Sequence, residues 1–201
     1  MSNTIFLIRH GETTWNRIGR LQGQADSPLT LRGTQQAKAI GQSLSRCLNN
    51  KQYLFWCSPL GRTRQTAAII CDIIGFDYEA IFFDKRLKEI TLGARDGYRS
   101  WQALIDDFPE EMKIRAKDPW NFTHPNGESS QMVKERLKPL LEQIQETDGT
   151  HIIVSHGVVS KIIRGMYLNL SPTETFALDR PQDAFHRLQD DLIEKIEVDL
   201  K

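Results

Sequence analysis

The sequence predicts an α/β fold, a three-layer α/β/α sandwich with a mostly parallel central sheet and a small helical lid insertion. Short apolar runs rich in β-branched residues alternate with stretches of helical periodicity along the 201 residues, which is typical of this class. Residues 98–124 depart from that pattern because they are aromatic and charged and are interrupted by Pro109 and Pro119. A chain of this length suits one domain over residues 1–201, with residues 98–124 as the lid insertion.

The first half of the chain predicts three strands and two helices. Residues 5–8 are expected to form the first buried strand, and the glycine-rich residues 11–29 predict a loop. Thr30 can cap a helix that runs to about residue 48. The other elements expected here are a strand at 53–57, a helix at 61–74 closed by Gly75, and a strand at 80–83.

The second half predicts the lid and the rest of the sandwich. The lid at 98–124 is expected to contain short helices that lie outside the sheet. Helices are expected at 128–145 and 158–168, on either side of a strand at 152–155. Two further strand candidates, at 184–188 and 193–198, follow near the end of the sequence.

Composition argues against several classes of protein. Lysine and arginine total 26, as do aspartate and glutamate, so the zero net charge argues against broad electrostatic binding to nucleic acid or to a membrane surface. The N-terminus lacks a basic leader, and no apolar stretch approaches the length of a membrane span. The 3 cysteines fit no zinc-binding spacing and indicate buried thiols in a reducing compartment. We therefore expect a cytoplasmic protein.

Two strand-like runs end on the same dipeptide, IFLIRHG at residues 5–11 and HIIVSHG at residues 151–157. His10 and His156 therefore each follow a predicted strand. In open α/β sheets, ligands bind beyond the carboxyl ends of the strands, so both histidines are expected at the same edge. Either histidine alone is more simply explained by a structural role, but the pair in matching contexts favours a shared functional site.

Two arginines accompany this pair. Arg9 ends a buried strand, where its charge needs an anion. Arg62 lies near the start of the helix predicted at 61–74, where the helix N-terminus also favours an anion, although a surface salt bridge is an open alternative. Arg64, two residues further on, points to a different face and is expected to be a solvated surface charge.

Five segments carry a further pattern: RHGETTWN (9–16), SPLGRTRQTA (58–67), LKEITLGARDG (87–97), NGES (126–129) and SHG (155–157). In this order they resemble the motifs of the histidine phosphatase superfamily, and more narrowly its phosphoglycerate mutase-like branch, over nearly the whole chain. The resemblance implies that His10 is the nucleophile that forms a phosphohistidine. It implies that Glu89 protonates the leaving group and then activates water. It also implies phosphoryl contacts from Arg9, Arg62 and His156, phosphate contacts from Thr13 and Asn16, and an entrance lined by Gln22 and Gly23.

The chemistry of a phosphomonoester fits these residues without a metal or a cofactor. The dianion must meet an attacking group in line, with the charge on its oxygens neutralised. Two guanidinium groups and a protonated imidazole can supply the charge that magnesium often supplies. We therefore expect His10 to be neutral and His156 to be protonated, which requires different surroundings for the two rings. A metal site on these histidines is disfavoured, because no HxxxH or HxH spacing is present.

Departures from the family pattern favour a phosphatase over a mutase. Cofactor-dependent mutases of the family resemble a longer chain, with an Arg-His-Tyr-Gly stretch directly after the acid and a basic insertion that clamps the substrate carboxylate. Here ITLGARDG follows Glu89 and the insertion is short. The prediction is a metal-independent phosphomonoesterase that acts on a small phosphorylated metabolite, with water as the final acceptor. A cofactor-dependent phosphoglycerate mutase and a non-catalytic phospho-ligand binding module are the alternatives.

Substrate choice is open at this level. The lid contains four aromatic residues for which packing is favoured over substrate contact: Trp101, Phe108, Trp120 and Phe122. His124 is expected at the surface, whereas His151 and His186 are expected to be structural. Sugar phosphates, phosphoserine, nucleotides and a cobalamin-pathway phosphate ester all fit the predicted chemistry. The oligomeric state is equally open, a homodimer included.

Overall fold

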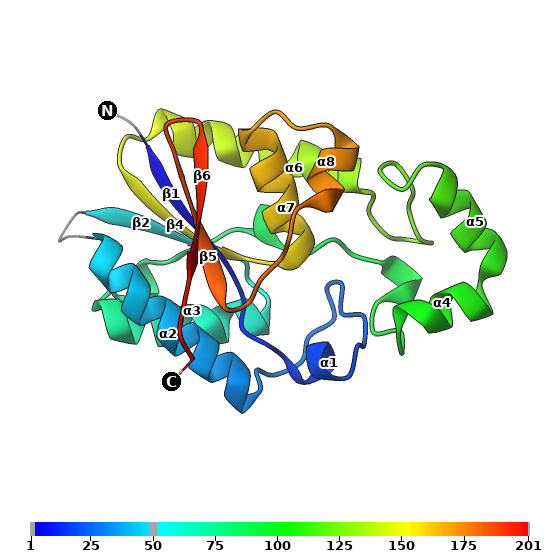
Figure 1. Cartoon of the computed structure of the whole chain (residues 1–201), viewed down its shortest axis with the longest axis horizontal. Helices are drawn as coiled ribbons and strands as arrows, with labels where there is room; N and C mark the ends of the chain where they lie inside the picture. The colour runs from blue at the N-terminus through cyan, green and yellow to red at the C-terminus, as the bar shows by residue number, and fades with distance from the viewer. Residues whose placement is uncertain (1–2, 49–51, 201) are drawn as a thin grey trace.

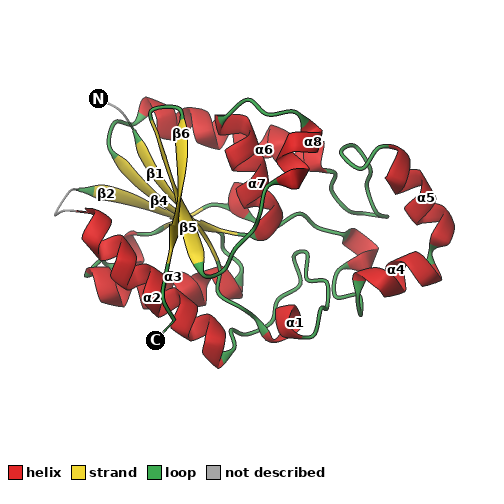
Figure 2. Ribbon diagram, in the orientation of Figure 1, coloured by secondary structure: helices red, strands yellow, loops and turns green. Residues whose placement is uncertain are grey.

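The computed structural model describes residues 3–48 and 52–200, which form one mixed sheet with helices on both faces (Figure 1, Figure 2). The strand order in the sheet is β3-β2-β4-β1-β5-β6. The first four strands along the chain pair in parallel, β5 pairs antiparallel with β1, and β6 pairs antiparallel with β5. This confirms the predicted α/β/α sandwich with a mostly parallel sheet. The strands are β1 (Thr4–Arg9), β2 (Tyr53–Cys57), β3 (Phe82–Phe83), β4 (Thr150–Ser155), β5 (Ala184–Gln189) and β6 (Leu192–Glu197).

Side chains of β1 alternate between two apolar cores, one on each face of the sheet. Ile5 and Leu7 pack with α6 and α7, whereas Phe6 and Ile8 pack with α2 and α3. A strand covered on both faces needs an unbroken apolar run, which is why the sequence of β1 does not alternate with polar residues. The four covering helices are α2 (Leu31–Leu48), α3 (Gly61–Ile74), α6 (Ser130–Glu146) and α7 (Gly157–Tyr167).

Register between the two central strands sets the position of the site. β1 pairs with β4 in parallel, and Arg9 lies opposite Ser155 at their carboxyl ends. The next residue on each strand is therefore the histidine of an HG dipeptide. This confirms the prediction that His10 and His156 lie at the same edge of the sheet.

Predicted helix ends agree with the structure. Thr30 caps α2, because its Oγ1 accepts a hydrogen bond from the backbone N–H of Gly33 at 3.0 Å. Gly75 ends α3 in the left-handed conformation with φ 68°.

Three short elements differ from expectation. A single-turn helix, α1 (Thr14–Arg17), interrupts the segment predicted as loop, and a capping box between Thr13 and Asn16 stabilises it. The predicted strand at 80–83 shortens to β3, because Tyr78–Ala80 form a 3₁₀ turn instead. The helix α8 (Pro172–Ala177) was not predicted, although its Ser171 cap and Glu174 form a capping box.

The lid consists of α4 (Trp101–Asp107) and α5 (Pro109–Lys117), which lie apart from the sheet on the right of Figure 1. Pro109 occupies the first turn of α5, where its missing N–H leaves no hydrogen bond unmade. The short helices predicted for residues 98–124 are thus confirmed. None of the helices in the described residues is long and apolar enough to span a membrane.

Candidate active site

Two imidazole rings meet at the carboxyl edge of the sheet. The ring centroids of His10 and His156 lie 5.2 Å apart, with an interplanar angle of 61°. Both side chains are buried, at 3% and 0% exposure respectively. The pair inferred from the two HG dipeptides is therefore one structural unit.

The hydrogen bonds of His10 fix its tautomer. Its Nδ1 lies 2.8 Å from the carbonyl oxygen of Gly11, so Nδ1 carries the donated proton. Its Nε2 accepts a hydrogen bond from Nε of Arg62 at 3.3 Å. Burial, followed by the charges of Arg62 and Arg9, lowers the pKa of His10 well below its ordinary value. The ring is neutral near pH 7 and carries its lone pair on Nε2, which agrees with the prediction and suits a nucleophile.

His156 differs from expectation in its charge. Burial, followed by Arg62, His10 and Arg9, lowers the pKa of His156 well below its ordinary value, so the predicted protonated ring is wrong for the free protein. Its Nε2 lies 2.7 Å from Oγ of Ser58. When Ser58 donates this bond, the proton of the neutral ring lies on Nδ1. That buried atom has no hydrogen-bond partner among the described residues.

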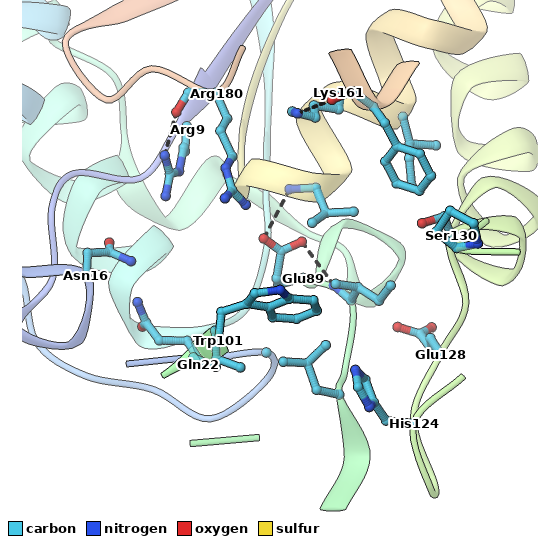
Figure 3. Close-up of a pocket in the computed structure, with 18 of the residues that line it drawn as sticks. Arg9, Asn16, Gln22, Glu89, Trp101, His124, Glu128, Ser130, Lys161 and Arg180 are labelled. Atoms are coloured by element: carbon cyan, nitrogen blue, oxygen red, sulfur yellow. Dashed lines mark hydrogen bonds between the residues drawn. The ribbon is translucent and has the colours of Figure 1, made fainter. Parts of the chain in front are cut away.

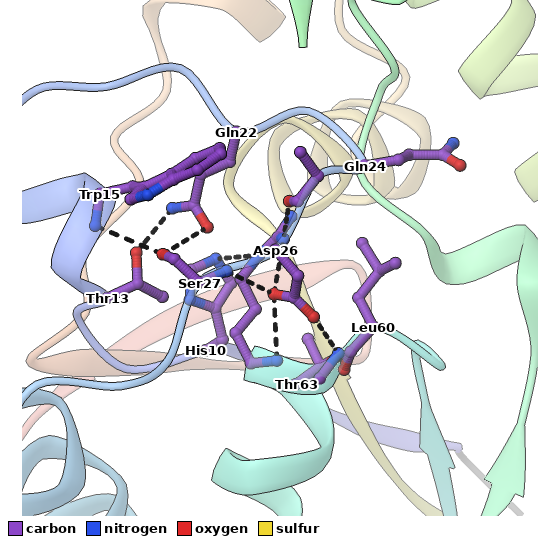
Figure 4. Close-up of polar contacts among 12 residues, drawn as sticks. His10, Thr13, Trp15, Gln22, Gln24, Asp26, Ser27, Leu60 and Thr63 are labelled. Atoms are coloured by element: carbon purple, nitrogen blue, oxygen red, sulfur yellow. Dashed lines mark hydrogen bonds and ion pairs between the residues drawn. The ribbon is translucent and has the colours of Figure 1, made fainter. Parts of the chain in front are cut away.

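Arg62 holds the nucleophile through a dense set of contacts. It occupies the first turn of α3 and is only 1% exposed. Besides the bond to His10, its Nη1 donates to the carbonyl of Ala25 at 2.8 Å and to Asp26 Oδ1 at 3.1 Å. Its Nη2 donates to the carbonyl of Gly23 at 2.7 Å. Asp26 also accepts from the backbone N–H of Gly61, so it ties the loop to the helix (Figure 4). Arg62 does pair with Asp26, but its guanidinium is buried and lines the cavity, so the alternative of a surface salt bridge is wrong.

Arg64 is exposed, as predicted, but its guanidinium also stacks over the ring of Phe83 at 4.3 Å from the centroid.

Arg9 is a second cation with unused hydrogen-bonding capacity. One Nη1 hydrogen bond runs to the carbonyl of Arg180, but the buried Nε has no partner among the described residues. Burial, followed by Arg180, lowers the pKa of Arg9 to about 10, so it remains charged near pH 7. Nε of Arg9 and Nδ1 of His156 are thus two buried polar atoms at one site that await partners. A guanidinium with a free N–H group is a donor suited to an anion with several oxygens.

Glu89 lies in the loop after the 3₁₀ turn Lys85–Leu87. Its Oε2 accepts from the backbone N–H of Val158 at 3.2 Å, in the first turn of α7, and its Oε1 accepts from Ile90 at 3.0 Å. Arg136 secures this loop by donating to the carbonyl of Lys88 at 2.7 Å. The carboxylate is therefore fixed at the site rather than free at the surface.

These groups border a cavity of about 700 Å³ (Figure 3). The sequence-predicted residues that line it are Arg9, His10, Asn16, Gln22, Gly23, Arg62 and Glu89. His156 and Thr13 are fully buried and do not belong to the lining. The hydroxyl of Thr13 is used by the backbone N–H of Asn16 and by Nε2 of Gln22. In this structure Thr13 therefore positions its neighbours instead of facing the cavity.

Gly23 is required by its surroundings. Its φ is +53°, and a Cβ built on it would lie 1.6 Å from Oδ1 of Asp96. Asp96 in turn accepts from Oγ1 of Thr91 at 2.8 Å and from the backbone N–H of Gln24 at 3.1 Å. Asp96 therefore joins the loop that supports Arg62 to the loop that follows Glu89.

His124 was predicted at the surface, and this prediction is wrong. The side chain is 4% exposed and lines the cavity, because the lid folds its ring between Trp101 and Phe122. Its Nδ1 bonds Oε1 of Glu111 at 2.5 Å, and Glu111 also accepts from Arg95 at 2.7 Å. Contacts within residues 98–124 bury this residue, and local sequence patterns do not encode those contacts.

Three of the four lid aromatics lie where they could contact a substrate, and the fourth has only a packing role. Trp101, Trp120 and Phe122 line the cavity, and Trp120 also joins the apolar core. Phe108 packs on Tyr98 and under Arg95 instead.

His151 and His186 are structural, as predicted. His151 is buried and bonded to Trp56 and to the carbonyl of Thr147. His186 is buried against Arg164.

Sequence reasoning missed further residues of the cavity wall. Gln182 donates to the carbonyl of His10 at 3.1 Å and to Asn16 Oδ1 at 3.0 Å. The other charged side chains that line the cavity are Arg20, Arg115, Glu128, Lys161 and Arg180. Glu128 belongs to the NGES segment and Arg20 to the segment predicted as loop, but neither was assigned a role. The other three come from the lid, α7 and the segment after α8, which no motif marked.

Comparisons with known proteins show a family and a fold that this chain shares. A family model described as histidine phosphatase superfamily (branch 1) matches residues 5–189. A Salmonella arizonae protein named probable phosphoglycerate mutase GpmB is 39% identical over 160 residues, which cover 77% of this chain and 69% of that protein. The alpha-ribazole phosphatase from Shigella flexneri has the same fold, with a TM-score of 0.82 at 23% identity over 97% of this chain and 95% of that chain. A mycobacterial glucosyl-3-phosphoglycerate phosphatase solved with VO3 gives 0.80 at 22% identity, over 98% and 99% of the two chains.

Proposed function

The chain belongs to branch 1 of the histidine phosphatase superfamily, and from this premise we propose that it is a metal-independent phosphomonoesterase that works through a phosphohistidine at residue 10. The observation that carries the proposal is the state of His10. Its neutral ring has Nε2 as the basic atom and lines a cavity that is rich in cations. The substrate would be a small phosphorylated metabolite.

In the first step, Nε2 of His10 attacks phosphorus, and the bond between phosphorus and the ester oxygen breaks. The hydrogen bond from Arg62 to Nε2 is given up as that atom becomes bonded to phosphorus. The phosphoryl oxygens would be held by Arg9, Arg62 and His156. The departing alkoxide takes its proton from the carboxyl group of Glu89, which acts as the general acid.

In the second step, water replaces the alcohol. Glu89, now a carboxylate, removes a proton from water, and the water oxygen attacks phosphorus. The bond from Nε2 to phosphorus breaks, which restores the lone pair of His10 and releases inorganic phosphate. The hydrogen bond from Nδ1 to the carbonyl of Gly11 stabilises the ring while it carries the phosphoryl group.

Fixed cations can perform the charge neutralisation that a metal ion would otherwise supply. Arg9 and Arg62 are held in place by the protein, so little reorganisation is needed when the dianion binds. The test is hydrolysis of 4-nitrophenyl phosphate with and without EDTA. We expect unchanged rates with the chelator and loss of activity in His10→Ala. A rate that collapses with EDTA and returns with a divalent metal would contradict the proposal.

A phosphoglycerate mutase is the second candidate, because relatives up to 39% identical carry that name. Both activities share the first step and differ in the acceptor of the phosphoryl group. The short segment ITLGARDG after Glu89 favours water as acceptor. Incubation with 3-phosphoglycerate, with and without a bisphosphoglycerate primer, separates the two. We expect inorganic phosphate as the product, whereas primer-dependent formation of 2-phosphoglycerate would establish a mutase.

We also propose a cytoplasmic location. The three cysteines, Cys47, Cys57 and Cys71, are free thiols, which suits a reducing compartment. Fractionation of cells with a compartment marker tests this location.

A further inference from the structure

The cavity holds more positive charge than one phosphoryl group requires. Arg9 and Arg180 both lie against the N-terminus of α7. A Cβ built on Gly157 would lie 3.4 Å from Nε of Arg9 and 3.2 Å from Cδ of Arg180. The N-terminus of α7 adds the positive end of the helix dipole at the same place. Two guanidinium groups side by side are costly unless anions separate them.

Lys161 extends this positive wall along α7. It follows Gly157 by four residues, so it lies on the same face about one turn, or roughly 5.4 Å, further along the helix. Val158 and Ile162 line the cavity on the same face. Nζ of Lys161 donates to the carbonyl of Phe176 at 2.6 Å, which leaves two of its three N–H groups for another partner. Figure 3 shows Lys161 and Arg180 on one side of Glu89, with Trp101 and His124 on the other.

Carboxylates of the protein do not neutralise these cations. Among the described residues, neither Lys161 nor Arg180 forms an ion pair with a carboxylate within 4.0 Å. The nearby Asp179 is occupied by Arg164 and Lys195. Burial, followed by the charges of Arg180 and Arg164, lowers the pKa of Lys161. The wall therefore has charge available for a ligand beyond the phosphoryl group.

We propose that Lys161 and Arg180 bind a second anionic group carried by the leaving group of the substrate. The substrate class is then a phosphomonoester whose alcohol bears its own carboxylate or second phosphate, placed about one helical turn from the phosphorus. The inference rests on the proposed function, because it assumes that the phosphoryl group occupies the end of the cavity at His10. Lys161 and Arg180 act in substrate recognition and take no part in proton or phosphoryl transfer.

The experiment compares two aryl esters that differ in charge alone. 3-Carboxyphenyl phosphate carries the second anion, and 3-carbamoylphenyl phosphate is its neutral counterpart of similar shape. The measured quantity is the ratio of kcat/KM for the carboxylate ester to that for the amide ester. We expect a ratio of about ten or more in the wild type, since a charged hydrogen bond is involved. In Lys161→Met the ratio should fall to about one, and in Arg180→Met it should fall in the same direction.

A matched control is Lys138→Met, which removes an exposed lysine of α6 outside the cavity and should keep the wild-type ratio. If Lys161→Met fails to fold, Arg180→Met still tests the inference. Arg180 lies in the loop between α8 and β5, where a substitution disturbs no helix. A wild-type ratio near one, or a high ratio that survives both substitutions, overturns the inference. Hydrolysis of neither ester would instead count against the proposed phosphatase activity, so the two failures are distinct.

Discussion

Nε of Arg62 lies 3.3 Å from Nε2 of His10, and the remaining hydrogen bonds of this guanidinium run to Gly23, Ala25 and Asp26. One side chain thus connects the nucleophile to the loop at residues 23–26. Because four of its N–H···acceptor contacts lie within the protein, Arg62 orients His10 before any substrate arrives. Burial, followed by this charge, lowers the pKa of His10 and so keeps its Nε2 unprotonated.

Arg62→Lys should reduce kcat/KM by about 10²–10³-fold, because lysine keeps the charge but cannot reproduce the planar set of hydrogen bonds. Arg64→Lys is the matched control on the same helix, where the side chain is exposed and stacks on Phe83. It should change kcat/KM by less than about twofold. Steady-state kinetics on an aryl phosphate checks both variants, and near-normal activity in Arg62→Lys would refute the positioning role.

Gly23→Ala should lower both stability and activity. The new methyl group would collide with Asp96, and the carbonyl of Gly23 would shift away from Arg62. Gly75→Ala is the control, because Gly75 has a similar φ of +68° and no atom of the described residues lies within 4 Å of the added Cβ. We expect Gly75→Ala to cost about 1–2 kcal/mol of unfolding free energy and Gly23→Ala about 1–3 kcal/mol more. Urea unfolding measures the difference, and equal losses would show that the contact with Asp96 is unimportant.

Glu111→Gln should destabilise the lid. Burial opposes ionisation of Glu111, but hydrogen bonds from Arg95 and His124 outweigh it and lower the pKa of this carboxyl. Removing the charge leaves Arg95 and His124 without their anionic partner, at a cost of about 1–3 kcal/mol. Glu110→Gln changes the neighbouring exposed carboxylate, which pairs with the exposed Lys113, and should stay within about 0.5 kcal/mol of wild type. Amide hydrogen exchange in α4 and α5 reports the lid directly, and identical protection in both variants would argue against this network.

Stability should fall as the pH drops from 7.0 to 5.5. Burial, followed by Arg164, lowers the pKa of His186 to about 4, and His10 and His156 are shifted in the same direction. Below about pH 6.5 the unfolded chain therefore binds more protons than the folded protein. The contribution of these neutral histidines to the free energy of unfolding is full above that pH and is lost as the pH falls towards 4. At pH 5.5 each such histidine should lower the free energy of unfolding by about 1 kcal/mol relative to pH 7.0. Urea unfolding at the two pH values tests this, and constant stability would contradict the buried neutral rings.

The lowered pKa of His10 also determines how activity depends on pH on the acidic side. His10 must be neutral to attack, and its lowered pKa keeps it so well below pH 6.5. The pH profile of kcat/KM should therefore show no loss attributable to His10 between pH 7 and 6. An NMR titration in which the His10 ring becomes protonated between pH 7 and 6 would contradict this assignment.

Local patterns predicted the parts of the site that depend on strand ends. His10 and His156 were recognisable because an apolar run followed by His-Gly marks the end of a strand, and parallel strands end at one edge. The place of Arg62 in the first turn of a helix made it a candidate, but the choice against a surface salt bridge came only from the family resemblance. Glu89 was identified only through the family resemblance, since nothing in its neighbours distinguishes it from an exposed loop carboxylate.

Features of the site that depend on tertiary packing could not be predicted from the sequence. Lys161 and Arg180 come from separate elements, and only the fold brings both to the wall of the cavity. His124 lies in a segment without periodicity, and its burial follows from how the lid folds back on itself. The charge of His156 depends on burial and on the combined field of Arg62, His10 and Arg9, which a linear sequence does not reveal.

Direct detection of the covalent intermediate tests the central claim most sharply. The protein is mixed with a ³²P-labelled phosphomonoester, quenched in alkali within milliseconds, and digested for peptide mass spectrometry. We predict an acid-labile, alkali-stable label on His10 that is absent from His10→Ala and that decays as inorganic phosphate forms. Turnover of the ester by the wild type with no label on residue 10, or with label on another residue, would contradict the claim.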